Sequence, residues 1–181
     1  MSEDAGASSR RDPAIPADDP ARELVVADPE DPKLPHFAVV GGTYTILVSG
    51  EQTGGRYCLI DLLVPDGAGP PPHRHDFEEL FTLLEGEIEF TFRGRSLVAK
   101  AGTTLNVPSN APHSFKNKSG GPARLLCLCA PAGQDVYFAA IGAPVESRTT
   151  PAPPLGAEER DAFLKKVFAL APQFHLELLG P

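Results

Sequence analysis

Short strand-like segments dominate the middle of this 181-residue chain. They are rich in β-branched and aromatic residues and are bounded by turn-forming pairs such as Gly41-Gly42, Gly54-Gly55 and Gly120-Gly121. The pattern predicts strands over 43–48, 57–64, 79–84, 87–93, 96–100, 103–107, 113–117, 124–129 and 136–140. Many short strands at this spacing favour an all-β sandwich or barrel of the jelly-roll type.

The segment before this β-rich region has a different composition. Residues 1–35 are rich in Pro, Asp and Ala, and such a sequence buries too little apolar surface to offset the entropy lost on ordering. We therefore expect a disordered acidic tail. Within it, the short apolar piece 23–27 is expected to pair with a sheet edge or a neighbouring subunit.

A Pro-rich linker over 149–156 follows the β-rich region and leads into a predicted helix. The helix begins near Ala157 with an acidic first turn and ends at Pro172. Its apolar stripe is expected to pack on the outer wall of the barrel or at a subunit interface rather than over a ligand; it comprises Phe163, Leu164, Val167, Phe168 and Ala171. The expected organisation is thus a tail over 1–35, a β-barrel over 36–148, and a linker plus helix over 149–181.

Charge and apolar patterning limit the partners of the chain. The formal net charge of −8 argues against nucleic acid or an anionic membrane surface. No apolar stretch has the length of a membrane span, and the N-terminal residues lack the apolar core of a secretory signal. Cys58, Cys127 and Cys129 lie in apolar strand-like runs and are interpreted as buried thiols in a reducing cytosol. We expect a cytoplasmic protein.

Three histidines and a glutamate have the spacing of a metal site. Alternate side chains of an extended strand share one face, so His73, His75 and Glu79 face the same way, whereas Glu78 faces the opposite way. Imidazoles and carboxylates are preferred ligands of borderline divalent metals. His36 and His175 match no such spacing and are interpreted as surface or packing residues.

Two motifs resemble those of the cupins. Gly67-(x5)-His73-x-His75-(x3)-Glu79-(x6)-Gly86 is similar to the first cupin motif, and Gly102-(x5)-Pro108-x-Asn110-(x2)-His113-(x3)-Asn117 is similar to the second. The one departure is Asn110, where the family usually has glycine, and asparagine tolerates a left-handed turn. The resemblance implies a single cupin-type jelly-roll barrel, a homodimer, and one divalent metal (Mn, Fe, Ni, Co or Zn) held by His73, His75, Glu79 and His113.

A looser resemblance to small quercetin dioxygenases implies an activity. It favours a metal-dependent dioxygenase that acts on a small hydroxylated aromatic or enol, flavonol-like molecule, with Glu79 as a catalytic base of raised pKa. The apolar neighbours Phe77, Phe81, Leu83 and Phe115 are interpreted mainly as core; the alternative is that some of them line a pocket for an aromatic or hydrophobic substrate. The cupin fold does not choose between this activity, an oxygen-independent isomerase, decarboxylase or hydrolase, and a non-catalytic protein that binds a small ligand.

Overall fold

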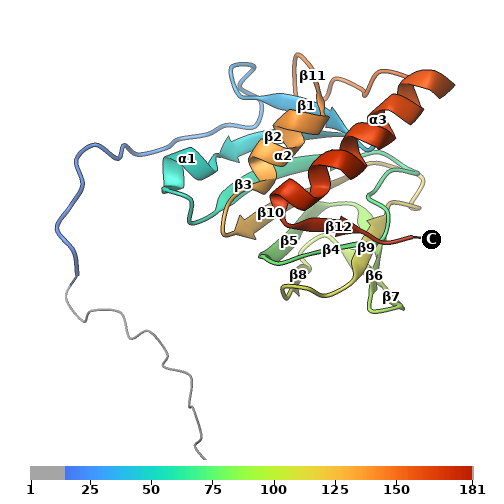
Figure 1. Cartoon of the computed structure of the whole chain (residues 1–181), viewed down its shortest axis with the longest axis horizontal. Coiled ribbons are helices and arrows are strands. Elements are labelled where there is room, and N and C mark those ends of the chain that lie inside the picture. Colours follow the sequence, from blue (N-terminus) through green and yellow to red (C-terminus); the bar gives the residue numbers. More distant parts are fainter. Residues whose placement is uncertain (1–14, 181) are drawn as a thin grey trace, which may run out of the picture.

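The chain folds into two antiparallel sheets that face each other as a jelly roll (Figure 1). The structure is a computed structural model and describes residues 15–180. Seven strands form the larger sheet in the order β11-β1-β2-β3-β10-β5-β8, and five form the smaller sheet in the order β12-β4-β9-β6-β7. The predicted all-β jelly roll is confirmed, but the two sheets remain separate and do not close into one continuous barrel.

The larger sheet contains β1 (His36–Val39), β2 (Gly42–Val48), β3 (Cys58–Val64), β5 (Glu78–Glu85), β8 (Thr104–Val107), β10 (Ala123–Ala130) and β11 (Ala143–Pro144). The smaller sheet contains β4 (His73–His75), β6 (Glu87–Phe92), β7 (Arg95–Lys100), β9 (His113–Lys116) and β12 (Leu176–Leu178). The helices are α1 (Gly50–Thr53), α2 (Gln134–Ile141), α3 (Ala157–Leu170) and the 3-10 turn η1 (Ala171–Phe174).

The core lies between the sheets because alternate side chains of each strand point inward. Strand β10 shows the alternation along its whole length, with Ala123, Leu125, Cys127 and Cys129 buried and the residues between them half-buried. Each strand predicted between residues 43 and 129 is present, with its ends displaced by at most one residue. The period-2 pattern therefore predicted most strands of the two sheets, but not β1, β4, β11 or β12.

The strand predicted over 136–140 is wrong, because these residues belong to helix α2. Their aromatic and β-branched composition is typical of a strand, but tertiary packing decides the outcome. The ring of Phe138 packs edge-on against Tyr44 with centroids 4.8 Å apart. At the start of the helix, the Asp135 carboxylate accepts hydrogen bonds from the backbone N–H groups of Gly50 and Gly133 at 2.8 and 3.2 Å.

The tail prediction has a mixed outcome. Residues 1–14 lie outside the described residues, so their expected disorder stays a prediction. The expected pairing of 23–27 with a sheet edge of this chain is wrong, because the segment forms no strand. Leu24 and Val26 are 89% and 86% exposed.

The predicted C-terminal helix is confirmed as α3. Its first turn is closed by Glu159, whose carboxylate accepts a hydrogen bond from the backbone N–H of Gly156 at 2.8 Å. Figure 1 shows α3 in red beside α2 in orange, both crossing the same side of the two sheets. The backbone then continues through η1 into β12, which pairs with β4 and so ties the C-terminal segment to the smaller sheet.

An ion pair between β10 and β3 is the main buried charge outside the space between the sheets. Asp61 is fully buried, and its Oδ2 accepts a hydrogen bond from Arg124 Nε at 2.9 Å and forms a salt bridge with Arg124 Nη2 at 2.8 Å. Among residues 15–180 the other oxygen, Oδ1, has no hydrogen-bond partner. The charge of Asp61 is therefore compensated by one side chain.

We expect Arg124→Leu to lower the free energy of unfolding by roughly 3–5 kcal/mol, because it leaves a buried carboxylate without its cation. Lys118→Leu is the control, since Lys118 pairs with Glu89 at 2.7 Å on an exposed part of the surface. Loss of that exposed pair should cost about 1 kcal/mol or less. Urea unfolding of the two variants measures the difference, and equal losses would contradict the assignment.

Candidate metal centre

Four side chains from both sheets meet between the sheets. His73 and His75 lie on β4, Glu79 on β5 and His113 on β9. Strand pairing places His73 directly opposite His113, whereas Glu79 reaches across from the larger sheet. We call His73, His75, Glu79 and His113 the donor set.

The alternation expected from the sequence holds from His73 to Phe81, although the chain changes sheets within this segment. His73, His75 and Glu79 are buried, and Arg74 and Glu78 are exposed. Glu79 rather than Glu78 therefore faces inward, as predicted. The two histidines outside the motifs stay apart from the donor set: His36 is buried against Thr45, and His175 is exposed beside Asp76.

The donor atoms of the set converge. Glu79 Oε2 lies 3.1 Å from His75 Nε2 and 3.1 Å from His113 Nε2. One ligand atom from each of the four residues lies within 4.8 Å of every other. All four side chains are buried, so bulk water does not separate them.

Backbone carbonyls fix the tautomer of each imidazole. Each Nδ1 atom lies close to a backbone carbonyl oxygen. The distances are 2.8 Å from His73 to Pro71, 2.9 Å from His75 to Phe77 and 2.9 Å from His113 to Ala111. A carbonyl oxygen only accepts, so each Nδ1 carries the hydrogen. The Nε2 atom of each ring is therefore the one left to bind a metal ion, and metal-binding histidines have the same arrangement.

This geometry calls for a cation. A carboxylate oxygen and the lone pairs of neutral imidazoles repel one another at 3.1 Å unless a positive charge lies among them. Either a metal ion or protonation of an imidazole supplies that charge. Three nitrogens and one oxygen suit a divalent first-row transition metal, so the donor set fits such an ion.

Turn geometry next to the donor set confirms the expectation for Asn110. Its φ of 65° is left-handed, the conformation that glycine usually adopts at this motif position. The backbone N–H of Asn110 donates to the carbonyl of His75 at 2.6 Å. The turn thereby holds the segment before His113 against β4.

Burial acts on the protonation of two members of the set. Burial, followed by the charge of His113, lowers the pKa of His73 to about 4, so this imidazole is neutral at neutral pH. Burial alone would raise the pKa of Glu79, but the imidazoles of His113 and His75 outweigh it and hold that pKa below its ordinary value. The raised pKa expected for a base is therefore wrong for these side chains by themselves.

Thiols occupy the other side of Glu79. Its Oε1 accepts from Cys127 Sγ at 3.3 Å and from Cys129 Sγ at 3.7 Å, and the two sulfurs are 3.6 Å apart. The expected burial of the three cysteines is confirmed. The hydrogen bond with Cys129 lowers the pKa of Cys127, but burial and the Glu79 charge outweigh it and raise that pKa to about 12.

A cavity of about 300 Å³ leads from the surface to the donor set. His73 and Glu79 line it, and its other walls are mainly apolar, including Phe81, Phe115 and Leu62. Helices α2 and α3 cover it with Tyr137, Phe138, Phe163, Leu164, Val167 and Phe168. The expectation that the α3 stripe packs away from any ligand space is therefore wrong, because the stripe lines this cavity.

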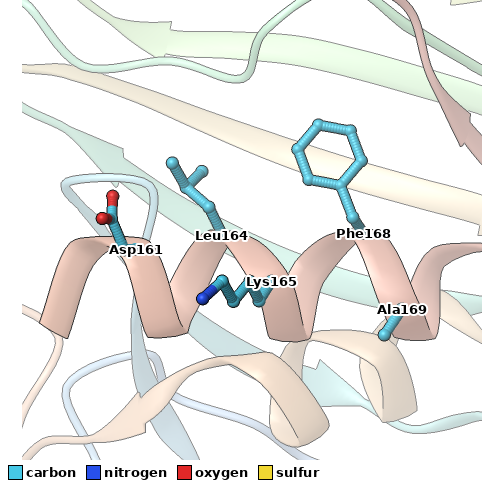
Figure 2. Close-up of a pocket in the computed structure, with 5 residues that line it drawn as sticks. All are labelled: Asp161, Leu164, Lys165, Phe168 and Ala169. Carbon is cyan, nitrogen blue, oxygen red and sulfur yellow. The ribbon is translucent and has the colours of Figure 1, made fainter. Parts of the chain in front are cut away.

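Helix α3 also lines a second, shallow hollow on the outer surface, shown in Figure 2. Leu164 and Phe168 project from the same side of the helix there, with Asp161 one turn before them. None of the donor set lines this hollow. The inner cavity, which does reach the donor set, is the candidate ligand site.

Sequence reasoning missed Tyr44, which also lines the inner cavity. Burial, with further contributions from Cys127 and Glu79, raises the pKa of its hydroxyl above the ordinary value. Among residues 15–180 no group hydrogen-bonds this hydroxyl, which leaves it free for a ligand. Its inward position on the predicted strand 43–48 was the available signal.

The fold and the donor set define a jelly-roll protein with an internal site that could hold a metal ion. Residues 61–129 match the family model described as a cupin domain. Residues 61–129 thus form a cupin domain, as the two motifs predict.

Two relatives known from their sequences illustrate the relationship. Quercetin 2,3-dioxygenase of Bacillus subtilis (strain 168) is 28% identical over 116 residues, which cover 64% of this chain and 34% of that protein. The HTH-type transcriptional regulator PuuR of Escherichia coli (strain K12) is 38% identical over 58 residues, covering 32% of this chain and 31% of the regulator. The chain thus spans about a third of the length of either relative.

Among solved structures, a predicted oxalate decarboxylase from Thermotoga maritima superposes with a TM-score of 0.52 at 22% identity, covering 59% of this chain and 98% of that one. At this identity the likeness shows the fold alone. Within residues 15–180, none of the helices combines the length and apolar character needed to cross a membrane.

The lowered pKa of His73 predicts acid sensitivity of the metal-free protein. Below its ordinary pKa of 6.5 the unfolded chain binds a proton that the folded chain refuses until about pH 4, so stability falls as the pH falls through this window. The loss attributable to His73 is about 3 kcal/mol. The Glu79 contribution is lost only below its ordinary value of 4.5.

Urea unfolding in the presence of a chelator, repeated between pH 7 and pH 4.5, measures this loss. His73→Gln removes the titrating group, and it should flatten the dependence above pH 4.5. A variant with the same pH dependence as the natural sequence would show that another group is responsible.

Proposed function

We propose that the chain is a metal-dependent dioxygenase acting on a small hydroxylated aromatic or enol, flavonol-like molecule. In this proposal the donor set holds one divalent transition metal, Mn, Fe, Ni, Co or Zn. The observation that carries it is the convergence of three imidazoles with the Glu79 carboxylate beside an apolar cavity that His73 and Glu79 line.

In this proposal the metal and the cavity have different roles: the metal would supply the chemistry, and the cavity would bind the ligand. A divalent ion held by three neutral imidazoles and one carboxylate retains a positive charge, and it would supply Lewis acidity and redox chemistry beside the cavity. The apolar walls bind the body of the ligand and exclude water. Phe81 and Phe115, arranged edge to face with centroids 5.5 Å apart, border the space nearest the donor set.

Two residues are assigned to the polar end of the ligand. Glu79 accepts the proton of the ligand hydroxyl group, since it is the carboxylate that lines the cavity. Tyr44 donates its otherwise unpaired hydroxyl to a second ligand oxygen. The similarity to quercetin 2,3-dioxygenase of Bacillus subtilis supports this class of ligand.

The same donor set and cavity also fit a second candidate function. A carboxylate that stays ionised is well suited to hold a metal and less suited to accept a proton. An oxygen-independent isomerase, decarboxylase or hydrolase, or a protein that binds a ligand without chemistry, would use the same donor set in this way.

We further propose that the protein is a cytoplasmic homodimer that binds neither nucleic acid nor membranes, with its parts divided at residues 35 and 148. The net charge of −8 supports the exclusion of nucleic acid. The exposed side chains of Leu24 and Val26 support a contact between two copies. Sedimentation at the mass of one chain would contradict the dimer.

Oxygen uptake tests the proposed activity. Protein loaded separately with Mn, Fe, Co or Ni is offered a panel of flavonols and related enols, and metal-dependent uptake is expected with at least one of them. Glu79→Gln should retain the metal and lose roughly 10²–10⁴-fold in turnover, because the base is removed while an oxygen ligand remains. Glu78→Gln is the matched control: Glu78 is adjacent but faces outward, bonded to Asn106 and Ser109.

Each other outcome selects between the alternatives. Full uptake by Glu79→Gln would remove the base assignment while leaving the dioxygenase. Turnover that persists without oxygen and with redox-inert Zn would establish the oxygen-independent enzyme. A ligand recovered unchanged from metal-loaded protein would support the binding protein.

A further inference from the structure

We infer that the thiols of Cys127 and Cys129 are positioning groups for Glu79, which hold its carboxylate so that Oε2 faces the three imidazoles. The inference rests on the proposed metal centre. It gives these cysteines a role in metal affinity in place of the simple packing role that their sequence environment suggests.

The two oxygens of Glu79 have separate sets of partners. Oε2 lies 3.1 Å from His75 Nε2 and from His113 Nε2, whereas Oε1 accepts from Cys127 at 3.3 Å and from Cys129 at 3.7 Å. No described group other than these thiols donates to Oε1 within residues 15–180. The thiols therefore decide which oxygen faces the centre.

Strand register makes this contact rigid. β10 pairs with β5 so that Cys129 lies directly opposite Glu79, and Cys127 lies opposite Phe81, the next inward residue. Alternation on β10 directs both sulfurs to the inward face, where the side chains are almost completely buried. The positions of both donors are thus fixed by the sheet rather than by flexible side chains.

Burial makes the contact consequential. Glu79 is only 3% exposed and no other donor within residues 15–180 is bonded to Oε1, so only water inside the cavity could replace a lost thiol. A buried carboxylate oxygen without a donor is unfavourable, and the carboxylate would rotate or shift to find one. Because partners of metal ligands orient those ligands, loss of the thiols would loosen the centre itself.

Cys58 provides a control within the same layer of the core. It is fully buried and lies directly opposite Cys129 across the β3–β10 pair. Its thiol hydrogen-bonds that of Cys129 but, among the described residues, makes no hydrogen bond with Glu79. Substitution of Cys58 therefore disturbs packing to a similar extent without removing a donor from Oε1.

The test is the affinity for Co²⁺, measured by competition with a chromogenic chelator on the full chain. The double variant Cys127→Ala/Cys129→Ala should bind Co²⁺ roughly 10–100-fold more weakly, with a changed ligand-field spectrum. Cys127→Ser/Cys129→Ser keeps two donors and should restore both the affinity and the spectrum. Cys58→Ala should bind Co²⁺ as the natural sequence does.

Several results would overturn the inference. One is Co²⁺ affinity of the double alanine variant equal to that of the natural sequence, and another is an equal loss of Co²⁺ affinity in the double serine variant. A third is a strong sulfur-to-cobalt charge-transfer band, which would show that the thiols are metal ligands instead. If the double alanine variant does not fold, as judged by circular dichroism, the single variants Cys127→Ala and Cys127→Ser carry the same comparison. Failure of the natural chain to bind Co²⁺ would overturn the metal centre and this inference together, whereas binding without oxygen uptake would sink the dioxygenase alone.

Discussion

The tautomer of three imidazole rings is the feature on which the rest of this structure depends. Each Nδ1 is bonded to a backbone carbonyl, so three lone pairs turn inward toward a carboxylate oxygen. That concentration of electron density is tolerable only with a cation in its midst. The strand pairing that brings His73 opposite His113, and the reach of Glu79 from the other sheet, both serve this one arrangement.

Local patterns made much of this structure predictable. Alternation along His73–Phe81 identified the inward carboxylate, and turn-bounded apolar runs identified most strands, because both depend on neighbours in sequence. The strand prediction for residues 136–140 was wrong. The packing of Phe138 on Tyr44 and the hydrogen bond from the Gly50 N–H to Asp135 favour a helix that composition alone does not indicate. The partners of Glu79 Oε1 depend on the register of β10 against β5, and the direction of its pKa shift depends on distances to two imidazoles; neither is written in the spacing of residues.

The C-terminal segment shows how an amphipathic pattern leaves its target open. The stripe of α3 predicts burial, but not which surface receives it. In the structure it covers the mouth of the cavity, and β12 fastens the end of the chain to the strand that carries His73 and His75. The C-terminal helix thus adds side chains to a ligand space whose other walls, such as Phe81 and Phe115, come from the strands that supply the donor set.

The carbonyls that orient the imidazoles belong to residues within two positions of each histidine, and they are main-chain atoms. A substitution that changes only a side chain does not delete a main-chain oxygen. Substitution of the surrounding side chains therefore leaves the hydrogen-bond acceptors of the imidazoles in place. The cavity wall and its helical cover are free to diversify toward new ligands while the three rings keep their orientation.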